Sequence, residues 1–381
     1  MKCKIEDIVE VTMGQSPKSQ YYNTEGNGVP FLQGNRTFGF KRPTFDTYTT
    51  LVTKSAKAGD VIMSVRAPVG DLNITPVEMC LGRGVCSLRM KNGNQEFLYY
   101  MMKYYMPQLL NKESGTVFGS VNRNDINGLE VDIPEDTDKQ KKIARYLTMI
   151  DDKVELNTEI NKNLEQQAQV YFDELFVVNA NPNWSECTLS DIGSVVAGGT
   201  PSKSKPEYYA DQGIAWITPK DLSVNKSKFI SHGENDISEL GFSKSSAAKM
   251  PAGTILFSSR APIGYIAIAQ NEVTTNQGFK SVIPNENIGT AYLYFLLKNL
   301  LPTIEGMASG STFKEISGSA MKSVPTVMPD ADTIQLFSSF CEPVFKEQEI
   351  LEAENKRLSA LRNSLLPKLM SGELDVSDID L

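Results

Sequence analysis

The stretches AGDVIMSVRAPVG (58–70) and AGTILFSSRAPIG (252–264) decide the fold of this chain of 381 residues. Both follow the pattern Ala-Gly, a short apolar run, Ser, then Arg-Ala-Pro-apolar-Gly, and Arg66 and Arg260 lie 194 positions apart. Two copies of so long a stretch indicate that the chain contains an internal duplication.

Further pairs of stretches match at similar spacings. They are CKIEDI (3–8) with CTLSDI (187–192), GQSPKS (14–19) with GGTPSK (198–203), GVPFLQGN (28–35) with GIAWITPKD (213–221), and SGTVF (114–118) with SGSTF (309–313). A register held through so many matches predicts a duplicated unit of roughly 190 residues, which is far longer than a solenoid repeat. Each unit must therefore contain a domain.

The first part of each unit has short β-branched runs bounded by Gly, Pro and Asp, which predict strands and tight turns. A more helical patch follows in each, QEFLYYMMKYYMPQLL (95–110) and TAYLYFLLKNLLPTI (290–304). The predicted fold class is mixed α/β (α+β), with similar globular domains at 1–137 and 179–329. The Met and aromatic side chains of the helical patches are expected in the cores.

The second part of each unit predicts a long helix, at 138–178 and at 330–374, with an acidic tail at 375–381. Residues 138–176 contain no Gly or Pro, and their 39 residues would form a helix of about 58 Å. We expect Pro343 to kink the second helix or to start its long part. Apolar residues and two asparagines recur at heptad-like spacing, and they define a predicted seam of Ile143, Leu147, Ile150, Val154, Asn157, Leu164, Val344, Leu351, Asn355, Leu358 and Leu365.

One apolar stripe per helix favours pairing of the two helices. Tandem copies related by a pseudo-two-fold axis would pair them antiparallel, as a coiled coil in which buried asparagines fix the register at a cost in stability. In the alternative interpretation, each helix only covers its own domain.

Acidic and basic residues are distributed unevenly. Residues 1–137 carry 15 acidic and 15 basic side chains, and residues 178–329 carry 12 of each, so the excess behind the net charge of −8 lies on the helices and tail. A domain that binds nucleic acid on its own usually shows a basic face. The loops GNRTFGFKRP (34–43) and TPKDLSVNKSKF (218–229) are nevertheless locally basic, with aromatic residues interleaved.

Several classes of function find no support in the sequence. There is no G-x-x-x-x-G-K-[ST] phosphate loop, and one histidine, His232, excludes most His-based catalysis. Five cysteines without a C-x-x-C pair indicate reduced thiols in a cytoplasmic protein, not a metal site. No apolar run is long enough to span a membrane. The acidic residues of PEDTDK (134–139) are interpreted as the opening of a helix and not as a nuclease cluster.

Two domains, each followed by a long helix, together with the closing stretch LRNSLLPKLMSGEL (361–374), resemble the specificity subunit of Type I restriction–modification systems. The opening GGTPSKSKPEYYADQGIAWITPKDL (198–222) and the SRAPIG turn are similar to the target recognition domains of that family. The first domain matches less closely, because GQSPKSQYYN replaces the GGTP opening.

The resemblance implies a chain that is not an enzyme. Each target recognition domain would recognise one half of a bipartite, asymmetric sequence in double-stranded DNA, and the paired helices would set the spacer between the halves. Two methyltransferase (modification) subunits and the restriction (motor-nuclease) subunits would be its partners. S-adenosylmethionine, ATP and Mg would be bound by those subunits, and no cofactor or metal by this chain.

The candidate DNA-binding residues lie in the basic loops, the Arg-Ala-Pro turns and the Ser-Gly-x-x-Phe loops. They are Asn35, Arg36, Lys41, Arg42, Arg66, Thr116, Arg123, Lys220, Lys226, Lys228, Arg260, Thr312 and Lys314. Because the Arg-Ala-Pro turn is shared by domains that would recognise different half-sites, Arg66 and Arg260 are expected to contact phosphate or to brace the turn, and not to recognise bases.

Two other hypotheses remain open at this point. The chain could be a coiled-coil adaptor whose duplicated domains bind two proteins and no DNA. It could also be an enzyme with an unfamiliar fold, although the sequence contains no recognisable catalytic cluster.

Overall fold

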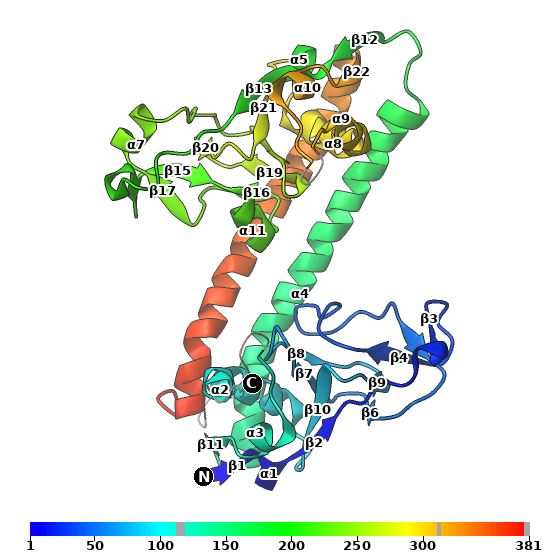
Figure 1. Cartoon of the computed structure of the whole chain (residues 1–381), viewed down its shortest axis with the longest axis vertical. Helices are drawn as coiled ribbons and strands as arrows, with labels where there is room; N and C mark the ends of the chain where they lie inside the picture. The colour runs from blue at the N-terminus through cyan, green and yellow to red at the C-terminus, as the bar shows by residue number, and fades with distance from the viewer. Residues whose placement is uncertain (112–118, 311–313, 377–381) are drawn as a thin grey trace. The chain divides into compact units, whose positions relative to one another are not determined.

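A computed structural model describes residues 1–111, 119–310 and 314–376 of the chain. These residues form two compact units, each with a globular domain and part of both long helices: unit 1 contains 1–156 and 354–381, and unit 2 contains 157–353. Figure 1 labels their helices and strands.

Unit 1 begins with the first globular domain, drawn from blue to cyan in Figure 1. Its elements are β1 (Lys2–Lys4), α1 (Ile5–Ile8), β2 (Val9–Met13), β3 (Tyr22–Asn23), β4 (Val29–Leu32), β5 (Tyr48–Thr49), β6 (Ser55–Ala56), β7 (Val61–Ser64), β8 (Leu72–Ile74), β9 (Met79–Leu81), β10 (Val85–Met90), α2 (Gln95–Leu110), α3 (Arg123–Asn127) and β11 (Glu130–Asp132). The strands form sheets ordered β2-β10-β7-β8, β3-β5-β4-β9-β6 and β1-β11.

Unit 2 contains the second globular domain, with nearly the same plan. Its elements are β12 (Ser185–Thr188), α5 (Leu189–Ile192), β13 (Gly193–Ala197), β14 (Tyr209–Ala210), β15 (Ile214–Ile217), α6 (Pro219–Val224), β16 (Phe229–Ile230), β17 (Asn235–Ile237), α7 (Glu239–Ser243), β18 (Ile255–Ser259), β19 (Ile263–Ala269), β20 (Thr274–Thr275), β21 (Lys280–Pro284), α8 (Thr290–Asn299), α9 (Leu301–Met307), α10 (Gly318–Lys322) and β22 (Pro325–Met328). The sheets are ordered β13-β21-β18-β19-β16, β14-β17-β15-β20 and β12-β22.

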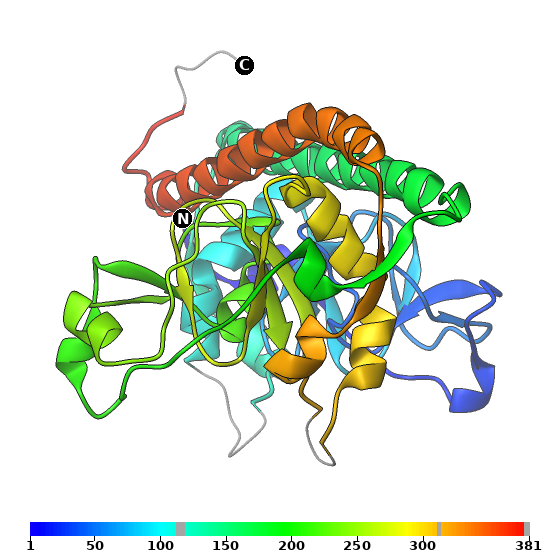
Figure 2. The same cartoon turned by 90° about the horizontal axis from the view of Figure 1, so that it is seen from above.

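The two domains share a topology as well as a sequence pattern. The order β3-β5-β4-β9 of unit 1 is repeated as β14-β17-β15-β20 in unit 2, and the equivalent pairs β4-β9 and β15-β20 are both parallel. In Figure 2 this outer sheet extends sideways from the rest of its own domain, in blue for unit 1 and in green for unit 2. The mixed α/β fold and the internal repeat expected from the sequence are therefore confirmed.

The long helices are α4 (Thr137–Asp173), which a π-helical turn continues to Val178, and α11 (Ala331–Ser371). Asp136 accepts from the backbone N–H of Asp138 (2.9 Å), and Asp330 accepts from that of Thr333 (2.8 Å), so a carboxylate caps each start. The acidic stretch before α4 thus opens a helix, as interpreted. The expectation that Pro343 starts the long part of the second helix is wrong, because α11 is continuous from Ala331 to Ser371.

The helices run antiparallel within each unit. In unit 1 the Arg362 guanidinium binds the buried Asp151 carboxylate at 2.7 Å, and Lys139, near the start of α4, lies 3.0 Å from Asp375, just after the end of α11. In unit 2 Gln348 donates to the Asn161 carbonyl (3.1 Å), and Tyr171 packs on Phe340, earlier in α11. The eleven predicted seam residues are all buried or half-buried.

Each domain core includes the ends of both helices. In unit 1, Ile143, Ala144 and Leu147 of α4 and Leu369 and Met370 of α11 belong to the hydrophobic cluster of the first domain. The corresponding cluster of unit 2 contains Ala168, Phe172 and Phe176 with Ile334, Phe337 and Cys341. The helices are therefore paired with each other and also packed into the domains, because their apolar faces are buried at the ends by domain residues.

Candidate nucleic-acid interface

The two Arg-Ala-Pro turns are built in the same way. The hydroxyl of Ser64 donates to the Pro68 carbonyl (2.8 Å) and accepts from the Asp71 N–H (2.9 Å). Ser258 makes the same pair of hydrogen bonds across its turn, each at 2.8 Å. Both serines are buried. A buried hydroxyl that both donates and accepts fixes the turn, which explains why Ser is present in both copies.

Each turn is joined to the segment that follows the Ser-Gly-x-x-Phe loop. Arg66 forms a β-bridge with Ser120, and Arg260 forms one with Glu315. In both domains a residue that follows this loop, 54 or 55 positions after the turn arginine, therefore lies beside the Arg-Ala-Pro turn. Thr116 and Thr312 lie outside the described residues.

The two turn arginines have different neighbours. Arg66 is exposed. The Arg260 guanidinium lies 3.4 Å from the Glu315 carboxylate, which also lies 3.6 Å from Lys280. Position 315 matches Ser120 in the first domain, so the carboxylate that braces Arg260 has a hydroxyl as its counterpart there.

Most of the remaining candidates are exposed side chains with a polar partner. Arg36 pairs with Asp46 (2.8 Å), Arg42 with Glu155 (2.5 Å) and Lys220 with Glu234 (2.6 Å). Asn35 donates to Asp71 (2.5 Å), and Arg123 donates to the Val11 carbonyl. Lys226 and Lys314 are also exposed. Exposed ion pairs contribute little to stability, so these cations remain available to a phosphate.

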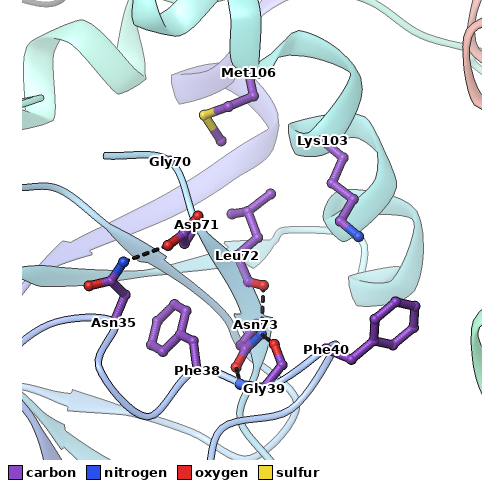
Figure 3. A pocket seen from close by; sticks show the side chains of 10 residues that line it. All are labelled: Asn35, Phe38, Gly39, Phe40, Gly70, Asp71, Leu72, Asn73, Lys103 and Met106. Carbon is purple, nitrogen blue, oxygen red and sulfur yellow. Dashed lines mark hydrogen bonds between the residues drawn. The ribbon is translucent and has the colours of Figure 1, made fainter. Parts of the chain in front are cut away.

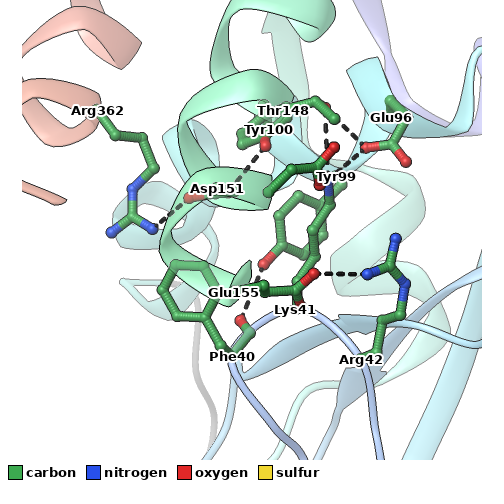
Figure 4. Close-up of polar contacts among 11 residues, drawn as sticks. Phe40, Lys41, Arg42, Glu96, Tyr99, Tyr100, Thr148, Asp151, Glu155 and Arg362 are labelled. Atoms are coloured by element: carbon green, nitrogen blue, oxygen red, sulfur yellow. Dashed lines mark hydrogen bonds and ion pairs between the residues drawn. The ribbon is translucent and has the colours of Figure 1, made fainter. Parts of the chain in front are cut away.

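Lys41 and Lys228 were expected to contact DNA, and this expectation is wrong, because both side chains are buried. The Lys41 ammonium lies 3.0 Å from Glu96 and 3.7 Å from Asp152 (Figure 4). The Lys228 ammonium lies 2.6 Å from Glu165 and 2.8 Å from the Gln348 side-chain oxygen. A lysine enclosed by its own carboxylate partners does not reach a DNA phosphate, so both lysines have roles inside their units.

A cavity of about 460 Å³ lies beside the first Arg-Ala-Pro turn (Figure 3). Its lining residues come from the basic loop, from β8 and the residues before it, and from α2: Asn35, Phe38, Gly39, Phe40, Gly70, Asp71, Leu72, Asn73, Lys103 and Met106. The Lys103 ammonium lies 5.9 Å from the Phe40 ring centroid and 4.6 Å from that of Tyr99. Burial lowers the pKa of Lys103 to about 8, and the Arg362 charge acts in the same direction. The loop of residues 34–43 therefore packs against α2.

Lys103 was not among the predicted residues, although the sequence contains a signal for it. FLYYMMK (97–103) matches YLYFLLK with Lys298 at its end, 195 positions later. Lys298 pairs with Glu165 at 2.6 Å. Both helical patches therefore end their apolar run in a lysine that faces the long helices or the basic loop.

The outer sheets carry equivalent hollows of about 350 Å³ and 540 Å³. Aromatic pairs line them, Tyr22 with Phe31 in unit 1 and Tyr209 with Trp216 in unit 2. The Arg36–Asp46 and Lys220–Glu234 ion pairs belong to the same hollows. The other polar lining differs between the copies: Gln33, Thr37 and Thr47 in the first, and Thr200, Lys203, Thr218, Asp221, Asn235, Asn276 and Gln277 in the second.

Within the described residues, no group of three or more His, Cys, Asp or Glu side chains is placed to hold a metal ion. Among the same residues, no helix is long and apolar enough to cross a membrane. His232 is an exposed side chain whose Nδ1 lies 3.2 Å from Asp236, consistent with a structural surface residue.

Comparison with known proteins gives consistent findings. The family model described as Type I restriction modification DNA specificity domain matches residues 1–166 and again 181–360. The chain is 40% identical over 190 residues to the Type I restriction enzyme MjaIX specificity subunit of Methanocaldococcus jannaschii, which covers 48% of this chain and 44% of that protein. It is also 26% identical over 408 residues to the Type I restriction enzyme HindI specificity subunit of Haemophilus influenzae. That match covers 84% of this chain and 88% of the other protein.

The chain thus spans less than half the length of the M. jannaschii relative in that match. Among solved structures, the S subunit of a Type I restriction–modification system from M. genitalium aligns with a TM-score of 0.64 over 97% of this chain and 95% of the other, at 17% identity. At that identity, the similarity shows a shared fold.

Proposed function

This chain belongs to the family of Type I restriction–modification DNA specificity domains, and we propose that it selects the DNA target of a restriction–modification complex. In this proposal each globular domain recognises one half of a bipartite, asymmetric sequence, and α4 with α11 sets the spacer. The observation that carries it is the duplicated domain whose two copies both incorporate the ends of the same two antiparallel helices.

Differences between the copies support recognition of two different half-sites. The hollows of the outer sheets share their aromatic pair and their ion pair, but their other polar side chains differ. Arg, Asn, Gln, Asp and Glu are the side chains that distinguish base edges by hydrogen bonding. Equivalent positions with different donors and acceptors are what an asymmetric target requires.

The chain has no catalytic role in this proposal. Two methyltransferase subunits and the motor-nuclease subunits would act on the DNA, and they would bind S-adenosylmethionine, ATP and Mg. The neutral charge of the globular domains agrees with partners that contribute part of the phosphate affinity.

Methylome sequencing tests the proposal. A host that expresses this chain with an adenine methyltransferase subunit of the same system is expected to show a bipartite motif with modified adenine, lost when this chain is deleted. Binding of scrambled and target duplexes with equal affinity by the assembled complex would contradict the proposal. Capture of two copies of a protein that is not a methyltransferase, without DNA binding, would favour the adaptor.

The turn arginines give a second expected result. Replacement of Arg66 or Arg260 by Ala is expected to reduce the slope of log affinity against log salt by about 0.9, the value for one phosphate contact, without changing the motif. The measurement is a salt titration of DNA binding by the complex, with Lys54→Ala, an exposed lysine outside these loops, as the control. An unchanged slope would assign the arginines to bracing of the turn, and a changed base preference would make them base-recognising residues.

A further inference from the structure

In each domain, one long connecting segment leaves the outer sheet and packs against the long helices. This segment is called the excursion below. The excursion joins β4 to β5 in unit 1 (33–47) and β15 to β17 in unit 2 (218–234). It contains most of the basic candidate residues of its domain, and it contains one buried lysine, Lys41 or Lys228.

The two lysines occupy equivalent positions. The Ile74 N–H donates to the Lys41 carbonyl at 2.8 Å, and the Ile268 N–H donates to the Lys228 carbonyl at 2.7 Å. Ile74 and Ile268 are themselves 194 positions apart, the spacing of the duplicated turn. The lysines therefore derive from one position of the repeated unit.

The Lys41 side chain binds two helices of unit 1 (Figure 4). Its ammonium lies 3.0 Å from Glu96 of α2, and 3.4 Å from the Thr148 hydroxyl and 3.7 Å from the Asp152 carboxylate, both of α4. The adjacent Phe40 ring stacks near the Arg362 guanidinium of α11, at 5.4 Å. The excursion of unit 1 is thus fixed to both long helices.

The Lys228 side chain does the same in unit 2 with different partners. Its ammonium lies 2.6 Å from Glu165 of α4 and 2.8 Å from Gln348 of α11, and 3.6 Å from the ring centroid of Phe345. The backbone N–H of Lys228 donates to Glu352 of α11 at 2.8 Å. Although the partners differ, the connection between excursion and helices is present in both copies.

Stability alone does not account for two buried lysines. A buried ammonium loses its hydration, and an apolar side chain of similar length often stabilises a protein as well or better. The charge restricts the excursion to one position on the long helices. An ammonium group finds hydrogen-bond acceptors at only one position, whereas an apolar side chain can pack at several registers of a helix surface. A role in positioning explains why the lysine is present in both copies.

We propose that Lys41 and Lys228 are positioning residues for DNA recognition, which fix each excursion at one place on the long helices. The exposed side chains of the excursion, Arg36 in unit 1 and Lys220 in unit 2, are then presented to DNA in one orientation relative to the helices that set the spacer. The inference rests on the proposed function and adds to it the residues that couple recognition to the spacer.

The test uses Lys41→Met and Lys228→Met in the full chain, assembled with its methyltransferase subunit. Methionine keeps the length of the aliphatic side chain. Glu96 and Asp152, the carboxylates that Lys41→Met leaves, are about half exposed, and Glu165, which Lys228→Met leaves, keeps Lys298 at 2.6 Å, so both variants are expected to fold. Methylation rates are measured on the target duplex and on duplexes with one base pair changed in either half-site. Each variant is expected to lose about tenfold of the discrimination in one half-site, a different half for each variant, with the other half unchanged.

Three further variants separate positioning from stability. Lys54→Met and Lys244→Met remove exposed lysines of the same domains, and both are expected to keep wild-type discrimination. Gln348→Met removes one acceptor of Lys228, is expected to relax the same half-site, and is expected to add nothing to Lys228→Met, because the two side chains act together. This variant also serves if Lys228→Met gives too little protein.

Unchanged discrimination in both lysine variants, or an equal loss in both half-sites, would overturn the inference while the bipartite motif of the wild-type complex still supported the proposed function. Absence of a bipartite motif from the wild-type complex would instead contradict the proposed function.

Discussion

Removal of one heptad from each long helix, residues 157–163 of α4 and 353–359 of α11, is expected to reduce methylation at the original target on the order of 100-fold. Seven residues correspond to about 10 Å of helix and leave the helix faces within about 20° of their original directions. Ten ångströms of DNA is about 3 base pairs, which also rotates a half-site by about 100°. Twisting or bending the DNA to compensate would cost several kcal/mol.

The two deleted stretches contain the Asn161 carbonyl that accepts from Gln348 and the Glu354 carboxylate that pairs with Lys153, and they otherwise lie between sets of contacts that fix the helices. In α4 they leave Glu155 and Glu165 in place, and in α11 they leave Glu352 and Arg362. Methylome sequencing of a host carrying the double deletion is the measurement. Any motif that remains is expected to keep both half-sites and to have a spacer shorter by at most about 3 base pairs.

A deletion of 157–163 alone is the matched control. It shortens α4 by one heptad without a matching change in α11, so it is expected to lower stability and not to define a new spacer. Full methylation at the original spacer by the double deletion would show that the helices do not set the distance between the half-sites.

Replacement of Glu165 by Leu is expected to lower the free energy of unfolding of unit 2 by about 3 kcal/mol at pH 7. One carboxylate oxygen of Glu165 accepts from Lys228 (2.6 Å), and the other accepts from Lys298 (2.6 Å) and the Tyr294 hydroxyl (3.1 Å). Leucine leaves two ammonium groups without this carboxylate, and Lys228 is buried. Chemical denaturation followed by the fluorescence of Trp184 and Trp216, both in unit 2, measures the change.

The loss of stability in this variant is expected to shrink as the pH rises from 7 to about 8, the pKa of Lys228 in the wild type, and to change little above that pH. Burial already lowers the pKa of Lys228 to about 8 in the presence of Glu165, and removal of the carboxylate lowers this pKa further. The unfolded lysine keeps its proton up to about pH 10.4. Between the two folded-state pKa values, Lys228 of the folded wild type keeps its proton while Lys228 of the folded variant has lost it. The stability of the variant therefore rises relative to the wild type over this window, and above about pH 8 both proteins gain stability alike.

Two controls accompany Glu165→Leu. Glu159→Gln, at an exposed position of the same helix, is expected to change stability by less than about 0.5 kcal/mol. The double variant Glu165→Leu with Lys228→Met is expected to recover more than half of the loss, because it removes the buried charge together with its partner. No recovery would show that Glu165 acts through packing and not through its charge.

Much of the architecture could be predicted because it depends on repetition and periodicity. The match of 58–70 with 252–264 indicates two similar domains even when their fold is not known. The run without Gly or Pro before Phe176 predicts a long helix. The seam at Val154 and Leu351 follows from heptad spacing, and both side chains are buried.

The residues that pack against each helix could not be predicted. Apolar periodicity indicates that one face of a helix is buried, but it does not indicate which element buries that face. Ile143 and Leu147 were assigned to a helix pair, and they also pack into the first domain. Pro343 was expected to kink the second helix or to start its long part, and the second of these is wrong, because α11 passes through Pro343. Packing of Phe337, Cys341 and Phe345 around that turn stabilises the helix against the local cost of proline.

By itself, the sequence determined the duplication, the class of each domain, the two long helices and their paired faces, because these properties are carried by residues near one another or by a repeated pattern. Only the tertiary structure decided that Lys41 and Lys228 are buried and that Arg36 and Lys220 remain at the surface. All four lie in similar polar, basic loops, and nothing local distinguishes them. The difference arises from acceptors on other elements, Glu96 and Asp152 for one lysine and Glu165 and Gln348 for the other, which folding brings from distant parts of the chain.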